Sequence, residues 1–309
     1  MTARAKSNLV SVIIPFIVFT TIWGSTWIVI RDQLTSVPAF WSVTYRFTIA
    51  AAAMAVLARV RGESLRIGRK GLIAAAWIGL FQFTINFNFV YLAERHITSG
   101  LVATVFALLL IPNTMLAWAL LGQRPSLSFL CWSVPAIGGV MLLFAHELAQ
   151  HPAQSGEIML GIALTLLGVV GASAGNVLQA REQVRAYPLF ALLAWAMAFG
   201  AAGDIVLALL FSGPPVFEAR VGYVAGLLYL ALAASALAFS LYFPVIRKIG
   251  PAKAAYSSVL VPLIAMSIST WVEGYRWTPL TITGVLLALG GMVGALNTSR
   301  TKAVVPDAG

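Results

Sequence analysis

Residues 9–30 read LVSVIIPFIVFTTIWGSTWIVI, and Arg31, Asp32 and Gln33 follow directly. No charged residue interrupts the run, and a helix that crosses the hydrocarbon core of a bilayer needs about 20 apolar residues. The run is too long for the apolar part of a secretory signal peptide, and no A-x-A cleavage pattern follows it. We therefore expect residues 9–30 to form the first transmembrane helix.

The composition extends this interpretation to the whole chain of 309 residues. Hydrophobic residues make up 60% and charged residues 10%, whereas soluble domains have about 45–50% apolar and 25% charged residues. The single cysteine cannot form an internal disulfide, which excludes a disulfide scaffold. The apolar content also excludes a disordered chain. The composition therefore indicates a polytopic membrane protein.

Ten apolar runs are long enough to span a bilayer, and prolines or charged residues separate them. Proline is expected at the start of a helix, where its missing amide hydrogen leaves no bond unmade. The predicted spans are residues 9–30, 38–58, 72–93, 98–121, 127–146, 158–180, 188–211, 222–246, 252–272 and 279–297.

The distribution of basic residues predicts the orientation of these spans. With the N-terminus in the cytoplasm, the outer loops hold four of the 20 basic residues: Arg31, Arg95, Arg220 and Arg276. Arg46 lies within the second span, and the other fifteen lie on the cytoplasmic side, as the positive-inside rule requires. We predict a multi-pass protein of a bacterial inner membrane with both termini in the cytoplasm. The same scattered distribution argues against a nucleic-acid partner, which would need a clustered basic face.

The chain contains an internal repeat. Residues 95–144 align with 247–296 at a constant offset, and Arg31-Asp32-Gln33 after the first span matches Arg181-Glu182-Gln183 after the sixth. Each repeat holds five spans, so the second must enter the membrane upside down, which is typical of carriers that work by alternating access. The predicted fold is therefore all-α, with ten transmembrane helices as two inverted five-helix repeats. Residues 1–150 and 151–309 form these repeats, and together they make one transmembrane domain.

Several short motifs are distributed over both halves of the chain. They are Ile22-Trp23-Gly24-Ser25-Thr26-Trp27, Pro38 with Arg46-Phe47, Tyr91-Leu92-Ala93, Pro112, Leu121-Gly122 and Gly138-Gly139, then Gly250-Pro251-Ala252, Pro262 and Gly290-Gly291. On these motifs nearly the whole chain resembles the drug/metabolite transporter superfamily, in particular its ten-helix EamA-type members. One departure is Gly122-Gln123, where the family usually has Gly-Glu, and the second half has Glu273 before Gly274.

The resemblance implies an exporter of small metabolites, and the aromatic central spans look most like those of the aromatic amino-acid exporters. We expect export of aromatic and other neutral amino acids, with the lipid bilayer as the other partner and a monomer as the working expectation. Other metabolites or drugs, phosphate esters and nucleotide sugars stay open as alternative cargoes. The choice between uniport and proton antiport also stays open.

Polar and aromatic residues within the spans are the candidate substrate ligands, because polar groups in lipid usually face a cavity or another helix. Amides and hydroxyls could bind the ammonium and carboxylate of an amino acid, and aromatic rings could stack on its side chain. Ser257 also lies near a helix N-terminus, which favours a carboxylate. The same residues could serve only to join helices. The candidates are Trp23, Gln82, Asn86, Asn88, Trp195, Ser235, Ser240, Tyr256 and Ser257.

Two charged residues lie deep within predicted spans, Arg46 in the second and Asp204 in the seventh. Their similar depth permits a buried ion pair, or Asp204 could carry a coupled proton. Alternatively, Arg46 reaches back to Asp32 at the end of the first span.

An enzyme is the remote alternative. Gly171-Ala172-Ser173-Ala174-Gly175 matches the G-x-S-x-G pattern of serine hydrolases. An intramembrane serine protease would need a histidine at the depth of Ser173, whereas His96, His146 and His151 lie at span ends or in loops. Packing is the other explanation of these glycines, of Gly168, and of Gly290 and Gly294 in the tenth span. No nucleotide-binding or metal-binding motif is present, so we predict no catalytic residue, no metal and no cofactor.

Overall fold

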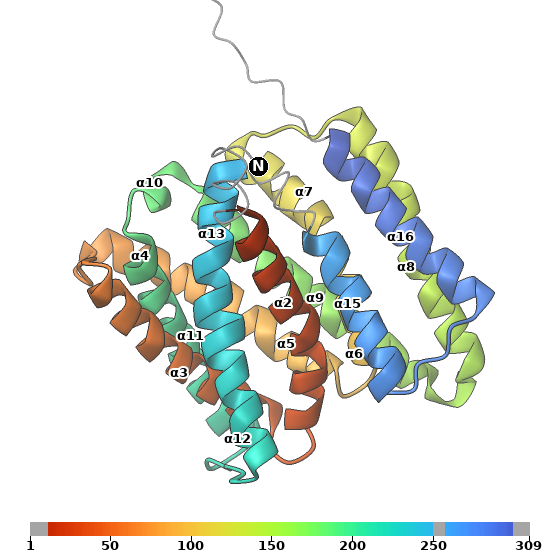
Figure 1. Cartoon of the computed structure of the whole chain (residues 1–309), viewed down its shortest axis with the longest axis horizontal. Coiled ribbons are helices and arrows are strands. Elements are labelled where there is room, and N and C mark those ends of the chain that lie inside the picture. The colour runs from red at the N-terminus through yellow and green to blue at the C-terminus, as the bar shows by residue number, and fades with distance from the viewer. Residues whose placement is uncertain (1–11, 250–256, 299–309) are drawn as a thin grey trace, which may run out of the picture.

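A computed structural model describes residues 12–249 and 257–298, and in these ranges the chain is a bundle of membrane-length helices (Figure 1). The first half contains α2 (Ile14–Gln33), α3 (Ala39–Val60), the continuous α4 (Gly68–Ile78), η2 (Gly79–Ile85) and α5 (Asn86–Ala93), the continuous α6 (Ser99–Phe106), η3 (Ala107–Leu109) and α7 (Leu110–Leu121), and α8 (Leu127–Gln150). The second half contains η4 (Pro152–Gln154), α9 (Ser155–Ala180), the short α10 (Glu182–Arg185), α11 (Leu189–Phe211), the continuous α12 (Val221–Leu228), η5 (Tyr229–Leu237) and α13 (Ala238–Ile249), α15 (Ser257–Val272) and α16 (Pro279–Thr298).

Eight of the described helices are long and apolar enough to cross a membrane, and two shorter apolar helices, α15 and α16, complete the predicted ten. The prediction of an all-helical fold with ten apolar helices is thus confirmed. The first helix ends at Gln33 rather than Ile30, because Leu34 N–H still donates to the Ile30 carbonyl at 3.2 Å. The predicted start of the first span and residues 252–256 of the ninth lie outside the described residues.

Two π-helical segments occupy equivalent places in the two halves. η2 lies within the third helix and η5 within the eighth, and hydropathy gave no sign of either. A π-helical turn inserts an extra residue into the helix and rotates the residues beyond it, and such turns are frequent at functional sites. Gln82 lies in η2 and Ser235 in η5, so both predicted ligands belong to these irregular segments.

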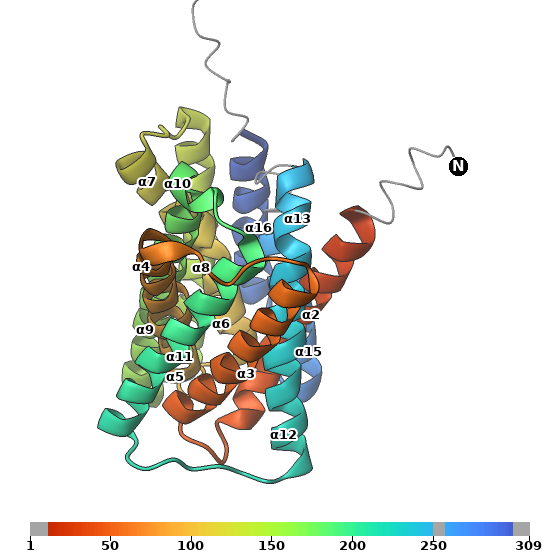
Figure 2. The same cartoon turned by 90° about the vertical axis from the view of Figure 1, so that its left-hand side faces the viewer.

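The helices run between two ends of the bundle, which Figures 1 and 2 show at the top and bottom. We name them by one residue each. The Arg61 end carries the connections 61–67, 122–126 and 181–188, and the Glu273 end carries 34–38, 94–98, 212–220 and 273–278.

Glycines permit the closest helix contacts. α8 and α16 lie side by side at one edge of the bundle (Figure 1), and a Cβ at Gly139 would be 2.3 Å from the Ala288 nitrogen. A Cβ at Gly294 would likewise be 2.1 Å from the Trp132 ring. Among the glycines that the sequence analysis assigned to helix packing, Gly290 alone has open space, since a Cβ there would meet nothing within 4 Å.

Candidate functional site

A cavity lies between the helices of the bundle, and its empty volume, including open solvent, is about 1110 Å³. Both halves contribute to its wall. The lining residues used below are Trp23, Trp27, Arg46, Gln82, Asn86, Phe87, Phe106, Asn113, Ala172, Asn176, Phe239, Tyr242 and Ser257. No residue of the connections at the Glu273 end is among its described lining.

Arg46 is the one cationic side chain in the described lining of this cavity. It is 2% exposed, and its Nε donates to Ser235 Oγ at 3.1 Å while Nη1 donates to the Tyr91 hydroxyl at 3.4 Å. The guanidinium also lies over the Phe87 ring at 4.5 Å, a cation–π contact that stabilises a buried charge. Nη2 makes no hydrogen bond to a described residue and is therefore available to an anion in the cavity.

Arg46 forms an ion pair with neither of the two acids that the sequence analysis suggested. Among the described residues no carboxylate oxygen lies within 4.0 Å of its guanidinium, so it pairs neither with Asp204 nor with Asp32. Asp32 instead accepts from Arg220 Nη2 at 2.9 Å near the bundle surface. Asp204 is fully buried and accepts from Asn88 Nδ2 at 2.6 Å. Similar depth in two helices does not place two side chains on facing sides.

Gln82 and Asn86 both line the cavity from the third helix, as their spacing of one turn predicted. Asn86 Nδ2 donates to the Gln82 carbonyl at 3.2 Å. The side-chain oxygens Gln82 Oε1 and Asn86 Oδ1 are buried and accept no hydrogen bond in the described part of the chain. Buried acceptors without a donor are costly, so each oxygen is a candidate for a donor on a ligand.

Aromatic rings form much of the remaining wall. Trp23 lies edge-on to Phe239 and Tyr242, with ring centroids 5.4 and 4.9 Å apart, and its Nε1 donates to the Ala234 carbonyl at 3.1 Å. Trp27 and Phe106 also line the cavity and contact each other with ring centroids 5.5 Å apart. This wall suits a flat apolar group.

The structure separates the other predicted ligands. Ser257 lines the cavity, whereas Tyr256 lies outside the described residues. Asn88, Trp195, Ser235 and Ser240 are not among the residues that line it. Asn88 faces α11, because residues two apart on a helix point to different sides.

The three remaining side chains have structural partners. Trp195 Nε1 donates to the Leu65 carbonyl at 2.9 Å, which ties α11 to the connection at the Arg61 end. Ser240 donates to the Ala236 carbonyl at 2.6 Å within its own helix. Ser235 accepts from Arg46, so it positions the cavity cation without reaching the cavity itself.

Two asparagines that were not singled out in the sequence also line the cavity. Asn176 Nδ2 donates to Asn113 Oδ1 at 3.4 Å, which joins α9 to α7 on the side toward the Arg61 end. Both lie in apolar spans, and this was the signal that could have identified them.

The G-x-S-x-G segment serves helix packing. Ser173 is buried, and a Cβ at Gly175 would be 2.6 Å from Gln82 Oε1. His96 contacts Glu157 and His151 contacts Glu147, while His146 Nε2 lies 3.4 Å from Thr278 Oγ1. None of the three histidines contacts Ser173, so no histidine serves as a base for the hydrolase pattern.

Comparisons with known proteins agree with this fold. The chain is 29% identical to "Uncharacterized inner membrane transporter YedA" of Escherichia coli over 82% of this chain and 80% of that protein. It is 23% identical to "Protein PagO" of Salmonella typhimurium over 86% of each, and 21% identical to "Uncharacterized transporter YoaV" of Bacillus subtilis over 95% of this chain and all of that one.

A solved crystal structure with 18% sequence identity superposes on 94% of this chain and 98% of its own, with a TM-score of 0.67. That likeness concerns the fold alone. The profile of the EamA-like transporter family matches residues 10–145 and again residues 159–297. The chain therefore belongs to the EamA-like transporter family, and it is a multi-pass membrane transporter.

Proposed function

We propose that this transporter is a secondary carrier that exports neutral amino acids, aromatic ones in particular, from the cytoplasm by alternating access. The observation that carries the proposal is Arg46, a buried cation at the cavity whose Nη2 has no protein partner among the described residues. A buried charge without a counterion is costly, and the α-carboxylate of a substrate would supply one. Arginine also presents a planar fork that matches a carboxylate.

The rest of the cavity complements the other parts of such a substrate. The unpaired oxygens of Gln82 and Asn86 are suited to an ammonium group, which donates three hydrogen bonds. The aromatic wall around Trp23 and Trp27 is suited to an apolar or aromatic side chain. Phosphate esters and nucleotide sugars fit less well, because their multiple negative charges call for more than one cation.

The orientation of the cycle follows from charge. The positive-inside pattern supports a Glu273 end that faces outward and an Arg61 end that faces the cytoplasm. Both five-helix halves contribute to the wall, which agrees with a site at the interface of inverted repeats.

The test is uptake of labelled phenylalanine, tryptophan and threonine into proteoliposomes, with and without an imposed proton gradient. Saturable uptake above empty liposomes, with phenylalanine and tryptophan preferred, is expected. The response to the gradient distinguishes uniport from proton antiport. Folded protein that transports none of the three, but does transport a phosphorylated metabolite or a cationic drug, would overturn the proposal.

A further inference from the structure

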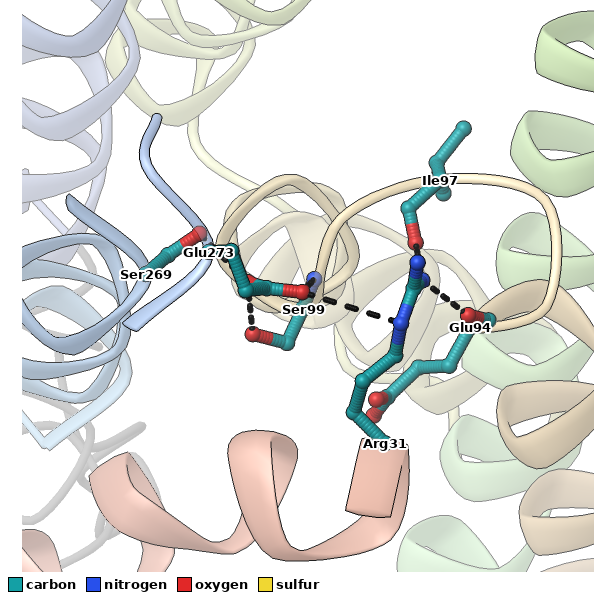
Figure 3. Close-up of polar contacts among 6 residues, drawn as sticks. All are labelled: Arg31, Glu94, Ile97, Ser99, Ser269 and Glu273. Atoms are coloured by element: carbon teal, nitrogen blue, oxygen red, sulfur yellow. Dashed lines mark hydrogen bonds and ion pairs between the residues drawn. The ribbon is translucent and has the colours of Figure 1, made fainter. Parts of the chain in front are cut away.

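The Glu273 end is closed by a polar cluster that joins the two repeats, made of Arg31, Glu94, Ile97, Ser99, Ser269 and Glu273 (Figure 3). Glu273, at the end of α15, accepts from Ser99 Oγ and Ser269 Oγ, both at 2.5 Å. Arg31, in the last turn of α2, lies with its Nε 3.9 Å from the same carboxylate. Any movement that opens this end must separate Glu273 from Ser99 and Arg31.

Glu94 is the unexplained member of the cluster. It is 0% exposed, yet neither carboxylate oxygen has a hydrogen-bond partner in the described part of the chain. Its backbone carbonyl, not its carboxylate, accepts from Arg31 Nη1, and the same Nη1 donates to the Ile97 carbonyl at 3.0 Å. Figure 3 shows the Glu94 side chain lying alongside Arg31 while the guanidinium points to these carbonyls and to Glu273.

Two acids therefore compete for one arginine. The charged and titratable groups around Glu94 are Arg31 on α2, Arg46 on α3, Tyr91 on α5 and Glu273 at the end of α15. Burial and then the Glu273 charge raise the pKa of the Glu94 carboxyl well above its usual range, and the opposing effects of Arg31 and Arg46 are smaller. A protonated Glu94 needs no counterion, so Arg31 remains with Glu273 and the cluster is stable.

We propose that Glu94 is a proton-binding site that controls this end of the carrier: protonation stabilises the closed cluster, and ionisation releases it. An ionised Glu94 would be a buried charge without a partner beside a second carboxylate, a costly arrangement that opening to water relieves. The closed form binds the proton more tightly than the open, hydrated form. Acidification therefore favours closure, and closure is lost as the pH rises. This inference rests on the alternating-access cycle under the proposed function but not on its substrate.

The test measures the opening of the Glu273 end directly. Spin labels are placed at Ser36→Cys and Arg276→Cys, two exposed positions on the connections of α2 and α15, in full-length Cys131→Ser protein in lipid nanodiscs. Distances between the labels are recorded without substrate from about pH 5 to about pH 9, a range that extends well above the ordinary pKa of a glutamate. The expected result is a short distance at low pH and a growing longer-distance population as the pH rises.

Two glutamine variants separate Glu94 from other acids. Glu94→Gln, which has the size and neutrality of the protonated acid, is expected to keep the short distance at every pH. Glu157→Gln is the matched control, because Glu157 is an exposed acid whose contact is with His96, outside the cluster. In Glu157→Gln the distance between the labels should change with pH as it does in the parent protein. A parent without pH response, or Glu94→Gln with an unchanged response, would overturn the proposal.

A third variant retains Glu94 and tests the proposal even if Glu94→Gln does not fold. Glu273→Gln removes the neighbouring charge that raises the proton affinity of Glu94, so the midpoint of the distance change should move to lower pH. A midpoint that stays in place or moves upward would contradict the model of two acids sharing Arg31. The spin-label measurement contains no substrate, so a negative result in it does not affect the proposal that the protein transports amino acids. Conversely, an uptake assay without amino-acid transport does not affect the interpretation of the spin-label distances.

Discussion

Replacing Arg46 with glutamine tests the central feature of the proposed binding site. Arg46 donates to Ser235 and Tyr91 and leaves Nη2 for a ligand, so the substitution removes the charge opposite the substrate carboxylate. A hydrogen bond to a charged group contributes about 1.5–3 kcal/mol. At about 1.4 kcal/mol per tenfold change, the KM for phenylalanine should rise about 10- to 150-fold.

The assay is the concentration dependence of phenylalanine uptake into proteoliposomes containing equal amounts of correctly inserted protein. The fold should tolerate the change, because removing a buried charge that lacks a counterion relieves a desolvation cost. Arg46→Lys should recover only part of the affinity, since lysine keeps the charge but lacks the planar fork.

Arg61→Gln is the matched control. Arg61 directly follows the same helix, α3, and its guanidinium lies over the Phe190 ring at 5.4 Å, but it is exposed and does not line the cavity. Its KM should be that of the parent. A phenylalanine KM in Arg46→Gln that equals the parent's would refute the assignment of the carboxylate to Arg46.

Three further substitutions test the wall, the packing behind it and the other buried acid. Trp23→Ala should weaken phenylalanine uptake more than threonine uptake in the same vesicles, because a lost aromatic contact costs about 0.5–1.5 kcal/mol. Gly175→Ala should displace the Gln82 amide and lower the melting temperature, since overpacking costs about 1–3 kcal/mol, whereas Gly156→Ala on the same helix has open space around it and should melt like the parent. Asp204→Asn should leave the pH dependence of transport unchanged if Glu94 binds the proton, and a lost pH dependence would instead assign coupling to Asp204.

The sequence predicted the spans well because the bilayer imposes one simple requirement on every helix. Twenty apolar residues between breaks identify a span whatever its neighbours are, and each helix satisfies its own backbone hydrogen bonds. The helix ends differ by a few residues, because charged residues such as Arg31 continue the first helix for most of another turn.

The site was only partly predictable because hydropathy gives the depth of a residue but not its direction around the helix. Gln82 and Asn86 were placed on one face by their spacing, and both line the cavity. Asn88 and Asp204 have suitable depth but face each other at the contact between α5 and α11. The π-helical η5 changes the direction of residues beyond it, and Ser235 within it contacts Arg46.

The inverted repeat gives the two ends of the transporter related backbones, but the polar contacts at the Glu273 end are not repeated in the sequence of the other half. The repeat alignment pairs Arg31 with Arg181, so the arginine is present in both halves, but it pairs Glu273 with Leu121. Two hydroxyl hydrogen bonds to the Glu273 carboxylate contribute about 1.5–3 kcal/mol each, while the ion pair with the 41% exposed Arg31 adds at most about 1 kcal/mol.

Closure of the Arg61 end cannot use these contacts, because a leucine replaces the acid. In the proposed alternating-access cycle the two closed conformations therefore differ in free energy, and each 1.4 kcal/mol of that difference changes their ratio tenfold. In the proposed cycle a bias toward closure at the Glu273 end keeps the cavity facing the cytoplasm. Export then requires that substrate binding, or loss of the proton from Glu94, offset the stability of this one cluster.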